Sequence, residues 1–244
     1  MKGGEGLRTY KDYMKIKNNI DSNELYFYGE IVDESWDKWN DLDSCPADIL
    51  NYIAEIDTNK PLNIYINSGG GSVFAGLSMY NALKRLNCKK TVFVDGLAGS
   101  IASIIAMVGD EIYIPSNAYL MIHKPMGGAY GDANELRKMA DTLDRIQEGL
   151  LNVYKEKLKD GVDAETIDNM INDETWLTGE QVAYYFNINC IDAIDLVAKV
   201  EQSMAKDLPS DLKNLIVDTR DRQRQAEENE MIMELELIEL ECNL

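Results

Sequence analysis

Short apolar runs and amphipathic segments alternate along the central part of the chain. Runs rich in β-branched and aromatic residues lie at 24–31, 62–66, 91–94, 111–114 and 118–123. Helical spacing of apolar residues follows the second and third of these runs, and it also precedes residue 56. Strands that alternate with helices predict a largely parallel sheet covered by helices, which places the chain in the α/β class.

The strongest helical periodicity is found at 133–159. Apolar residues recur there every seven positions, and a second set follows three positions after the first: Leu136, Leu143 and Leu150, with Met139, Ile146 and Val153. An a/d seam over three heptads is long enough to pack on another helix. The seam is either one face of a helix within the domain or a contact between subunits, and both alternatives stay open.

The composition changes towards both ends of the chain. We predict an N-terminal arm at 1–23, one domain at 24–200 and an acidic extension at 201–244. Within the extension, 226–244 carry seven acidic residues and no basic one. We interpret this tail either as a partner-binding segment or as a disordered one. Near the end of the domain, 175–194 predict a helix followed by a short strand.

Charge and hydropathy exclude some classes of function. The chain has 244 residues and a formal net charge of −19 at pH 7. A surface this acidic repels phosphate backbones, so nucleic-acid binding is not expected. No apolar run is long enough to span a membrane, and the N-terminal residues lack the apolar core of a secretory signal.

The cysteines do not form the spacing of a metal site. They lie far apart in the sequence, at Cys45, Cys88, Cys190 and Cys242, and the chain has a single histidine. A Cys/His zinc site is therefore not expected, and nothing in the sequence calls for a cofactor. Reduced thiols and the lack of a secretory signal predict a cytoplasmic protein.

Ser100 and His123 are the first candidates for chemistry. Ser100 begins a helical segment after a strand and a small-residue turn, where the unpaired N–H groups of a first turn favour negative charge. The N–H of Ile101 would then point towards a tetrahedral oxyanion. His123 closes another strand, and strand ends in parallel sheets often line a site. Both residues have structural alternatives, because serine commonly caps helices and histidine can cap a strand.

A second serine and a glycine loop lie near these candidates. Ser103 lies one helical turn beyond Ser100, and we predict that it is packed in the interior. The stretch SGGGS at 68–72 links a strand to a helix, and its glycines leave backbone amides unshielded. It lacks the lysine of a phosphate loop, so it is better suited to hold a peptide backbone or a carbonyl oxygen. An orienting acid is offered by Asp173 or Glu174, and composition does not choose between them.

Four segments in order and spacing resemble the Clp-type (caseinolytic) protease proteolytic subunit, the ClpP family. They are YINSGGGSVFAGLSMYNAL, GLAGSIAS, LMIHKPMGGAYGDANEL and DETWLTGEQVAYYFNIN, and the resemblance covers about 24–195. It implies a crotonase-like α/β fold, with repeated ββα units and a long protruding "handle" helix at 133–159. It also implies a serine endopeptidase that needs no cofactor or metal.

The resemblance assigns roles residue by residue. It makes Ser100 the nucleophile and His123 the general base, and it excludes Ser103. It places the oxyanion hole at the N–H groups of Gly71 and Ile101. The aligned acid is Glu174, where the family usually has Asp, and Asp173 is the other candidate. It assigns substrate binding to Gly70, Ser72, Met126, Gly127, Gly128 and Tyr130, with 126–130 as the strand that pairs with extended substrate.

The resemblance also predicts the partners. Family members form heptameric rings, which pair through the handle into a hollow barrel that admits peptides or unfolded chains. This chain departs from the family at Gly69, which replaces a loop proline, in its N-terminal arm and in its acidic tail. These departures favour the phage and prophage branch, whose members are associated with head maturation. They count against docking to an AAA+ unfoldase.

Two other functions remain as alternatives. One is a catalytically impaired family member that serves as an assembly or scaffold protein, which the Glu at position 174 and the heptad helix favour. The other is a crotonase-type acyl-CoA hydratase or isomerase, which shares the fold but needs no serine nucleophile. The acidic surface counts against CoA, because its phosphates usually require basic contacts.

Overall fold

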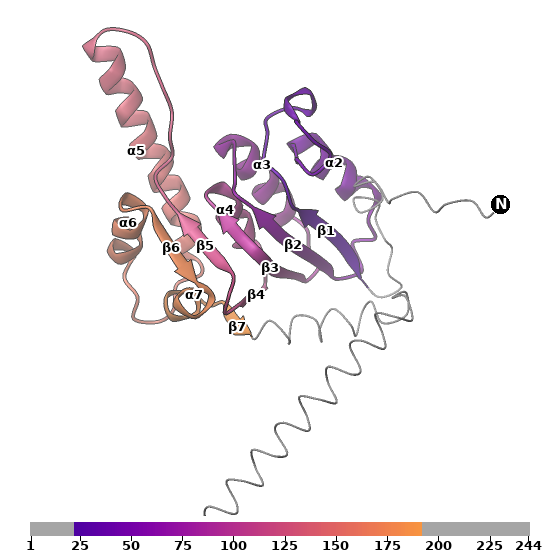
Figure 1. Cartoon of the computed structure of the whole chain (residues 1–244). Coiled ribbons are helices and arrows are strands. Elements are labelled where there is room, and N and C mark those ends of the chain that lie inside the picture. Colours follow the sequence, from indigo (N-terminus) through magenta and orange to yellow (C-terminus); the bar gives the residue numbers. More distant parts are fainter. Residues whose placement is uncertain (1–21, 192–244) are drawn as a thin grey trace, which may run out of the picture. The chain divides into compact units, whose positions relative to one another are not determined.

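The computed structural model describes residues 22–191, which form a mixed α/β fold (Figure 1). The strands are β1 (Asn23–Phe27), β2 (Leu62–Ser68), β3 (Lys90–Gly99), β4 (Glu111–Pro115), β5 (Tyr119–Ile122), β6 (Thr175–Thr178) and β7 (Asn189–Ile191). The helices are α2 (Pro46–Glu55), α3 (Val73–Lys84), α4 (Ile101–Ala106), α5 (Ala133–Lys155), α6 (Ala164–Asn172) and α7 (Gly179–Tyr185), with a 3₁₀ turn η1 (Ser35–Asp37).

Strand β3 is the branch point of the seven-stranded sheet. The strand order is β1-β2-β3-β4-β7, with all of these neighbours parallel. The first half of β3 pairs with β4, whereas its last residues pair with β5 in parallel, and β5 pairs with β6 in antiparallel. The sheet therefore divides along β3, which pairs with β4 through residues 91–93 and with β5 through residues 97–99.

The two faces of the sheet bury different side chains. On one face, aliphatic residues such as Leu62, Ile64 and Ile66 are fully buried in a core shared with the helices. The opposite face carries an aromatic ladder across four adjacent strands, with stacked ring centroids 4.7 to 5.5 Å apart: Tyr26, Tyr65, Phe93 and Tyr113. Burial on both faces is typical of a parallel sheet, because its strands are apolar on each side.

Most of the predicted elements are present. The helix after the glycine loop, the strands at 62–66, 111–114 and 118–123 and the long helix all form near the expected positions. The expectation of a loop at 95–99 is wrong, because β3 continues through Gly99 and pairs there with β5. The expectation that 175–194 begins with a helix is also wrong, since its first residues form β6 against β5. Helix α6 was not expected from the sequence.

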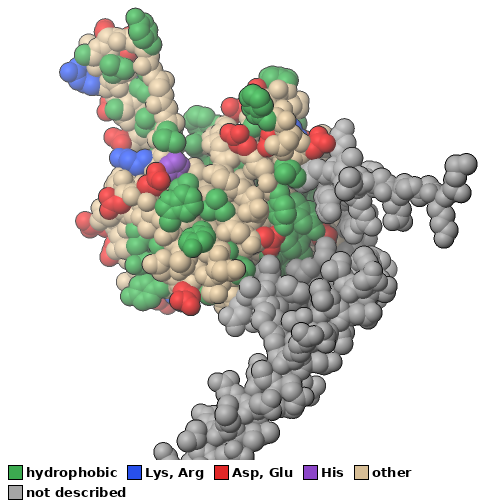
Figure 2. Space-filling view, viewed as in Figure 1, with side chains coloured by type: hydrophobic (Ala, Val, Ile, Leu, Met, Phe, Trp, Pro, Cys, Tyr) green, Lys and Arg blue, Asp and Glu red, His purple; other side chains and the backbone are tan. Residues whose placement is uncertain are grey.

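Helix α5 projects from the body of the fold (Figure 1). Its C-terminal part is packed in the core, where Leu150 and Val153 are buried. Its N-terminal part is only partly covered, and Leu136 is 49% exposed. Figure 2 shows hydrophobic side chains along this projecting part. The heptad seam therefore serves as an intradomain face at one end only, and the other end is left available for another chain.

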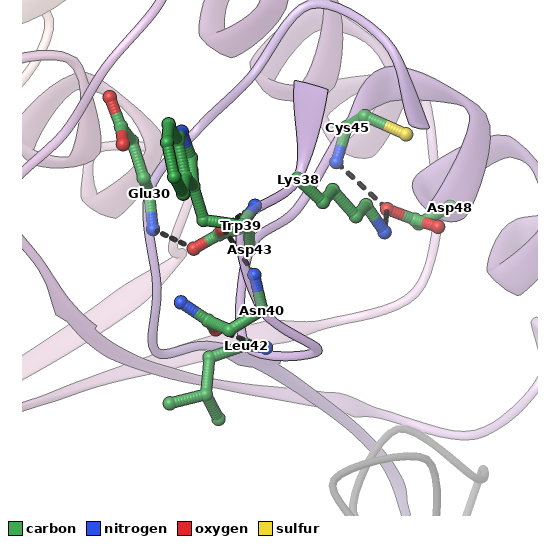
Figure 3. Close-up of polar contacts among 8 residues, drawn as sticks. All are labelled: Glu30, Lys38, Trp39, Asn40, Leu42, Asp43, Cys45 and Asp48. Carbon is green, nitrogen blue, oxygen red and sulfur yellow. Dashed lines mark hydrogen bonds and ion pairs between the residues drawn. The ribbon is translucent and has the colours of Figure 1, made fainter. Parts of the chain in front are cut away.

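The loop between β1 and α2 is held by one buried carboxylate (Figure 3). Asp43 is 2% exposed and accepts hydrogen bonds from the N–H groups of Glu30, Trp39 and Asn40 at 2.9, 2.9 and 3.2 Å. Three N–H donors satisfy the charge of a buried carboxylate. These hydrogen bonds to Asp43 hold the loop in place, while Trp36 and Trp39 remain 78% and 91% exposed.

Several expectations concern residues outside this structure. The acidic extension at 201–244 and nearly all of the predicted N-terminal arm at 1–23 lie outside the described residues. None of the helices between residues 22 and 191 is both long and apolar enough to cross a membrane. In the same part of the chain, no three His, Cys, Asp or Glu side chains are grouped so that they could hold a metal ion.

Candidate active site

Ser100 occupies a strained turn between β3 and α4. Its φ of 50° and ψ of −126° lie in a region that residues with a Cβ rarely adopt. Although Ser100 is the N-cap residue of α4, its side chain makes no capping hydrogen bond. Its Oγ instead lies 2.7 Å from Nε2 of His123. The geometry is that of a hydroxyl next to a base, and the capping alternative does not hold.

The register of β3 and β5 brings Ser100 and His123 together. Gly99 pairs with Met121, and the N–H of Ser100 donates to the Met121 carbonyl at 2.8 Å. Both residues thus leave the carboxyl ends of adjacent parallel strands, where side chains from different strands converge. The His123 side chain is only 14% exposed, which limits competition from water for its ring nitrogens.

Strand β6 places Glu174, rather than Asp173, beside the histidine. Ile122 pairs with Thr175 in the antiparallel ladder, so the next pair in the same register is His123 and Glu174. Oε2 of Glu174 lies 4.0 Å from Nδ1 of His123, which is an ion-pair distance rather than a hydrogen bond. Glu174 is 61% exposed on its side chain and has a positive φ of 49°.

Asp173 occupies a different environment. It is the C-cap of α6 and is exposed, and the structure from 22 to 191 gives it no contact with His123. Asp173 and Glu174 both lie in the turn between α6 and β6, and only Glu174 lies within ion-pair distance of His123. The geometry therefore favours Glu174 as the acid of a triad, with a contact that is looser than a hydrogen bond.

The glycine loop after β2 closely approaches Ser100. Gly70 and Gly71 have φ of 101° and 144°. A Cβ on Gly70 would lie 2.7 Å from the Ser100 Cβ, and one on Gly71 would lie 2.1 Å from the carbonyl oxygen of Ile31. Only glycine fits a backbone that is both at positive φ and this close to its neighbours.

The amides predicted for the oxyanion hole are available. Gly71 forms a bridge with Ile31, but the hydrogen bonds of that bridge use the N–H groups of Ile31 and Ser72. The N–H of Ile101 is the first of α4, so it has no partner within the helix. Ser72 itself caps α3, accepting from the N–H of Ala75 at 3.4 Å.

The segment at 124–131 is an unpaired stretch of backbone beside the site. It belongs to no strand or helix, and no hydrogen bond within the described part of the chain involves its backbone. Met126 and Tyr130 are 79% and 104% exposed. A Cβ on Gly127 would lie 2.5 Å from the Met139 side chain of α5, whereas one on Gly128 would meet nothing.

Further side-chain hydrogen bonds are made by residues next to Ser100 and in the glycine loop. Ser103 is fully buried, as predicted, and its Oγ contacts both the Ser100 carbonyl and the hydroxyl of Tyr154. Asp33 accepts a hydrogen bond from the Ser72 hydroxyl at 2.5 Å. Tyr154 and Asp33 were not expected from the sequence, because no local pattern distinguishes a buried tyrosine or an acid in a loop from many others.

Comparison with known proteins places this geometry in a family. The family model of Clp protease matches residues 10–218, which is most of the chain. This chain belongs to the Clp protease family. The family is one of serine peptidases, and its mixed α/β fold agrees with the ClpP and crotonase type of architecture.

Individual relatives are similar at a moderate level. The ATP-dependent Clp protease proteolytic subunit of Ligilactobacillus salivarius is 29% identical over 184 residues, covering 74% of this chain and 87% of the relative. That of Mesostigma viride is 29% identical over 202 residues, covering 79% and 83%. That of Bacteroides thetaiotaomicron is 30% identical over 139 residues, covering 56% of this chain and 62% of the relative.

Proposed function

We propose that this Clp protease family member is a serine endopeptidase whose nucleophile is Ser100. The observation that carries the proposal is the 2.7 Å contact between the Ser100 Oγ and Nε2 of His123, made by a serine that does not cap its helix. A nucleophile and a base within hydrogen-bond reach are the first requirement of covalent acyl transfer.

The proposed reaction uses these groups in two steps. Nε2 of His123 takes the Ser100 proton as Oγ forms a bond to the peptide carbonyl carbon, and the N–H groups of Gly71 and Ile101 hold the oxyanion. The C–N bond breaks as His123 returns the proton to the leaving amine. Water, deprotonated by His123, then attacks the acyl-enzyme, and Ser100 leaves with the proton. The Glu174 carboxylate stabilises the imidazolium across 4.0 Å.

The proposed substrate is an extended polypeptide. The unpaired backbone at 124–131 offers an edge to which an extended chain can add as a strand, and the glycine loop at 69–71 borders the nucleophile. Main-chain hydrogen bonds of this kind are made with any sequence, so the substrates are peptides or unfolded proteins. Met126 and Tyr130 are exposed beside this edge and would contact substrate side chains.

We propose that the protease works as a homo-oligomer, with heptameric rings that pair through α5 into a chamber. The support is the partly exposed apolar part of α5, since a monomer rarely leaves such a surface in water. Gly69, the N-terminal arm and the acidic extension also support the phage or prophage branch, where head maturation and no dedicated AAA+ unfoldase are expected. Cleavage of an unfolded protein without nucleotide or ATPase would support this assignment.

Labelling with a fluorophosphonate probe, read by intact mass and peptide mapping, tests the proposed nucleophile. We expect one adduct on Ser100 of the assembled protein, lost in Ser100→Ala and retained in Ser103→Ala. Hydrolysis of fluorogenic peptides should fall by several powers of ten in Ser100→Ala. An assembled protein that is neither labelled nor active would favour the scaffold function. Labelling of Ser100 would count against the acyl-CoA alternative, because that chemistry needs no serine nucleophile. Peptide hydrolysis that survives Ser100→Ala would overturn Ser100 as the nucleophile.

A further inference from the structure

A buried hydrogen-bond chain leads from α5 to the nucleophile turn. Tyr154 lies in the last turn of α5 and is 3% exposed, while Ser103 lies in α4 and is fully buried. The Ser103 Oγ is 2.6 Å from the Tyr154 hydroxyl and 2.5 Å from the Ser100 carbonyl oxygen. Polar contacts therefore connect two helices inside the fold, next to the hydrophobic core.

The directions of these hydrogen bonds are determined by chemistry. A carbonyl oxygen only accepts, so the single Ser103 hydroxyl proton is donated to the Ser100 carbonyl. Tyr154 must then donate its own proton to the Ser103 oxygen. Burial raises the pKa of Tyr154, which keeps its hydroxyl protonated as a donor.

The hydrogen bonds from Tyr154 and Ser103 end at the peptide group whose N–H is the proposed oxyanion donor. The Ser100 carbonyl and the Ile101 N–H belong to one planar unit. That carbonyl accepts from the Ser103 hydroxyl and also from the Ser103 N–H at 3.0 Å. Hydrogen bonds in sequence polarise one another, so donors to the carbonyl make the N–H on the other side of the unit a stronger donor.

The same contacts restrain a strained backbone. The ψ of Ser100, −126°, sets the direction in which the Ile101 N–H points, and its φ is positive. Such a conformation is energetically unfavourable and persists only where neighbouring contacts hold it. A serine hydroxyl often donates to a carbonyl of its own helix. Here the Ser103 Oγ also contacts the hydroxyl of Tyr154, which lies 51 positions away in the sequence.

We propose that Tyr154 and Ser103 are positioning residues that orient and polarise the Ser100–Ile101 peptide group as an oxyanion donor. The inference rests on the proposed function, because it requires Ser100 to be the nucleophile. It predicts an effect on the transition state and none on ground-state binding, since the oxyanion forms only during the reaction.

The test compares Tyr154→Phe and Ser103→Ala with Tyr52→Phe in the full-length assembled protein. Tyr52 is a matched control, because its hydroxyl is also buried but makes no hydrogen bond to any described residue. We expect kcat for a fluorogenic peptide to fall about fivefold to tenfold in each site variant, with KM unchanged. The inhibition constant of a peptide boronic acid, which forms a tetrahedral adduct, should rise by a similar factor. Tyr52→Phe should leave all three quantities unchanged.

The double variant separates positioning from simple packing. If Tyr154 acts through Ser103, then Tyr154→Phe combined with Ser103→Ala should lower kcat no further than Ser103→Ala alone. If the two substitutions only disturbed packing, their separate effects would multiply in the double variant. They would then lower the thermal midpoint and would not affect kcat selectively. Multiplying effects would overturn the proposal.

The experiment also distinguishes this inference from the proposed function. If the wild type is neither labelled nor active, or if Ser100→Ala keeps full activity, both fail together. If Ser100→Ala is inactive while Tyr154→Phe and Ser103→Ala match Tyr52→Phe, Ser100 remains the proposed nucleophile. The positioning role of Tyr154 and Ser103 is then overturned.

Discussion

Ser100, the proposed nucleophile, is held beside His123 in an unfavourable backbone conformation. Its positive φ frees the hydroxyl from helix capping and directs it to His123. The strain is tolerated because β5 accepts the Ser100 N–H and Ser103 donates to its carbonyl. A residue in this conformation costs about 1–3 kcal/mol, which the surrounding contacts must offset.

The acid should contribute less than in a tightly bonded triad. Glu174→Gln removes a charge that lies 4.0 Å from Nδ1 of His123 but is largely exposed to water. A charge pair at this distance contributes about 1–4 kcal/mol depending on its surroundings, so we expect kcat to fall about tenfold. Peptide hydrolysis by Glu174→Gln, with Asp173→Asn as the matched control, checks this. A loss as large as that of Ser100→Ala would contradict it.

Asp95 should make the stability of the protein depend on pH. Burial raises the pKa of its carboxyl, which accepts a hydrogen bond from the Tyr28 hydroxyl. A raised folded-state pKa stabilises the fold below the unfolded value, near 3.8, and this stabilisation is lost as pH rises through the folded value. Asp95→Asn should therefore be more stable than wild type at pH 7, with the gain vanishing below about pH 4.

Urea unfolding at several pH values measures this effect. Asp41→Asn is the control, because it removes one charge from an exposed position of the same chain. An Asp95→Asn variant that is no more stable than Asp41→Asn at pH 7 would contradict the burial argument.

At the scale of elements, the close approach of α3 and α4 keeps the Ile101 N–H, the proposed oxyanion donor, in place. A Cβ on Gly76 of α3 would lie 2.3 Å from Cγ1 of Ile101, the residue that opens α4. The two helices can therefore meet only where one has no side chain. The helix that presents the Ile101 N–H is thus located by a glycine outside the active site.

Gly76→Ala should consequently harm both stability and activity. Alanine favours helix by up to about 1 kcal/mol, but the clash with Ile101 should outweigh this and cost about 1–3 kcal/mol. We also expect kcat to fall with little change in KM. Gly149→Ala in α5 is the matched control, since its Cβ would meet no atom within 4 Å and should stabilise the protein. Equal stability of the two variants in urea unfolding would contradict this packing argument.

At the scale of the whole molecule, α5 divides into a core part and a free part. Leu150 is buried among the core residues, whereas Leu136 is half exposed and Leu143 is partly exposed. The same seven-residue repeat therefore serves two purposes along one helix. This division explains why the periodicity alone did not decide between an intradomain face and a subunit contact.

Substitutions at the two ends of α5 should have different consequences. Leu136→Gln combined with Leu143→Gln should weaken self-association about tenfold or more, because each leucine loses about 1.5–3 kcal/mol of burial. Leu150→Ala should instead lower the free energy of unfolding by about 2–5 kcal/mol. Analytical ultracentrifugation and urea unfolding measure the two effects. An unchanged assembly in the double variant would show that the exposed seam is not a subunit contact.

Local patterns in the chain were sufficient for much of this fold. The strands near 62–66 and 118–123, the long helix and the glycine loop follow from periodicity and turn chemistry, which depend on neighbouring residues. The same patterns placed Ser100 and His123 at strand ends. Local patterns gave a wrong prediction where the structure depends on a neighbouring strand. Residues 95–99 resemble a loop in sequence, but they extend β3 because β5 pairs with them.

Contacts between distant segments settled the remaining features. The contact of His123 with Glu174 rather than Asp173 depends on the register of β6 against β5, and the link from Tyr154 to Ser103 joins two helices. Neither contact can be predicted from the neighbouring sequence, because strand register and helix packing are determined by burial against the rest of the fold. Residue types along the chain therefore indicated which groups were available for chemistry, while folding selected which of them meet.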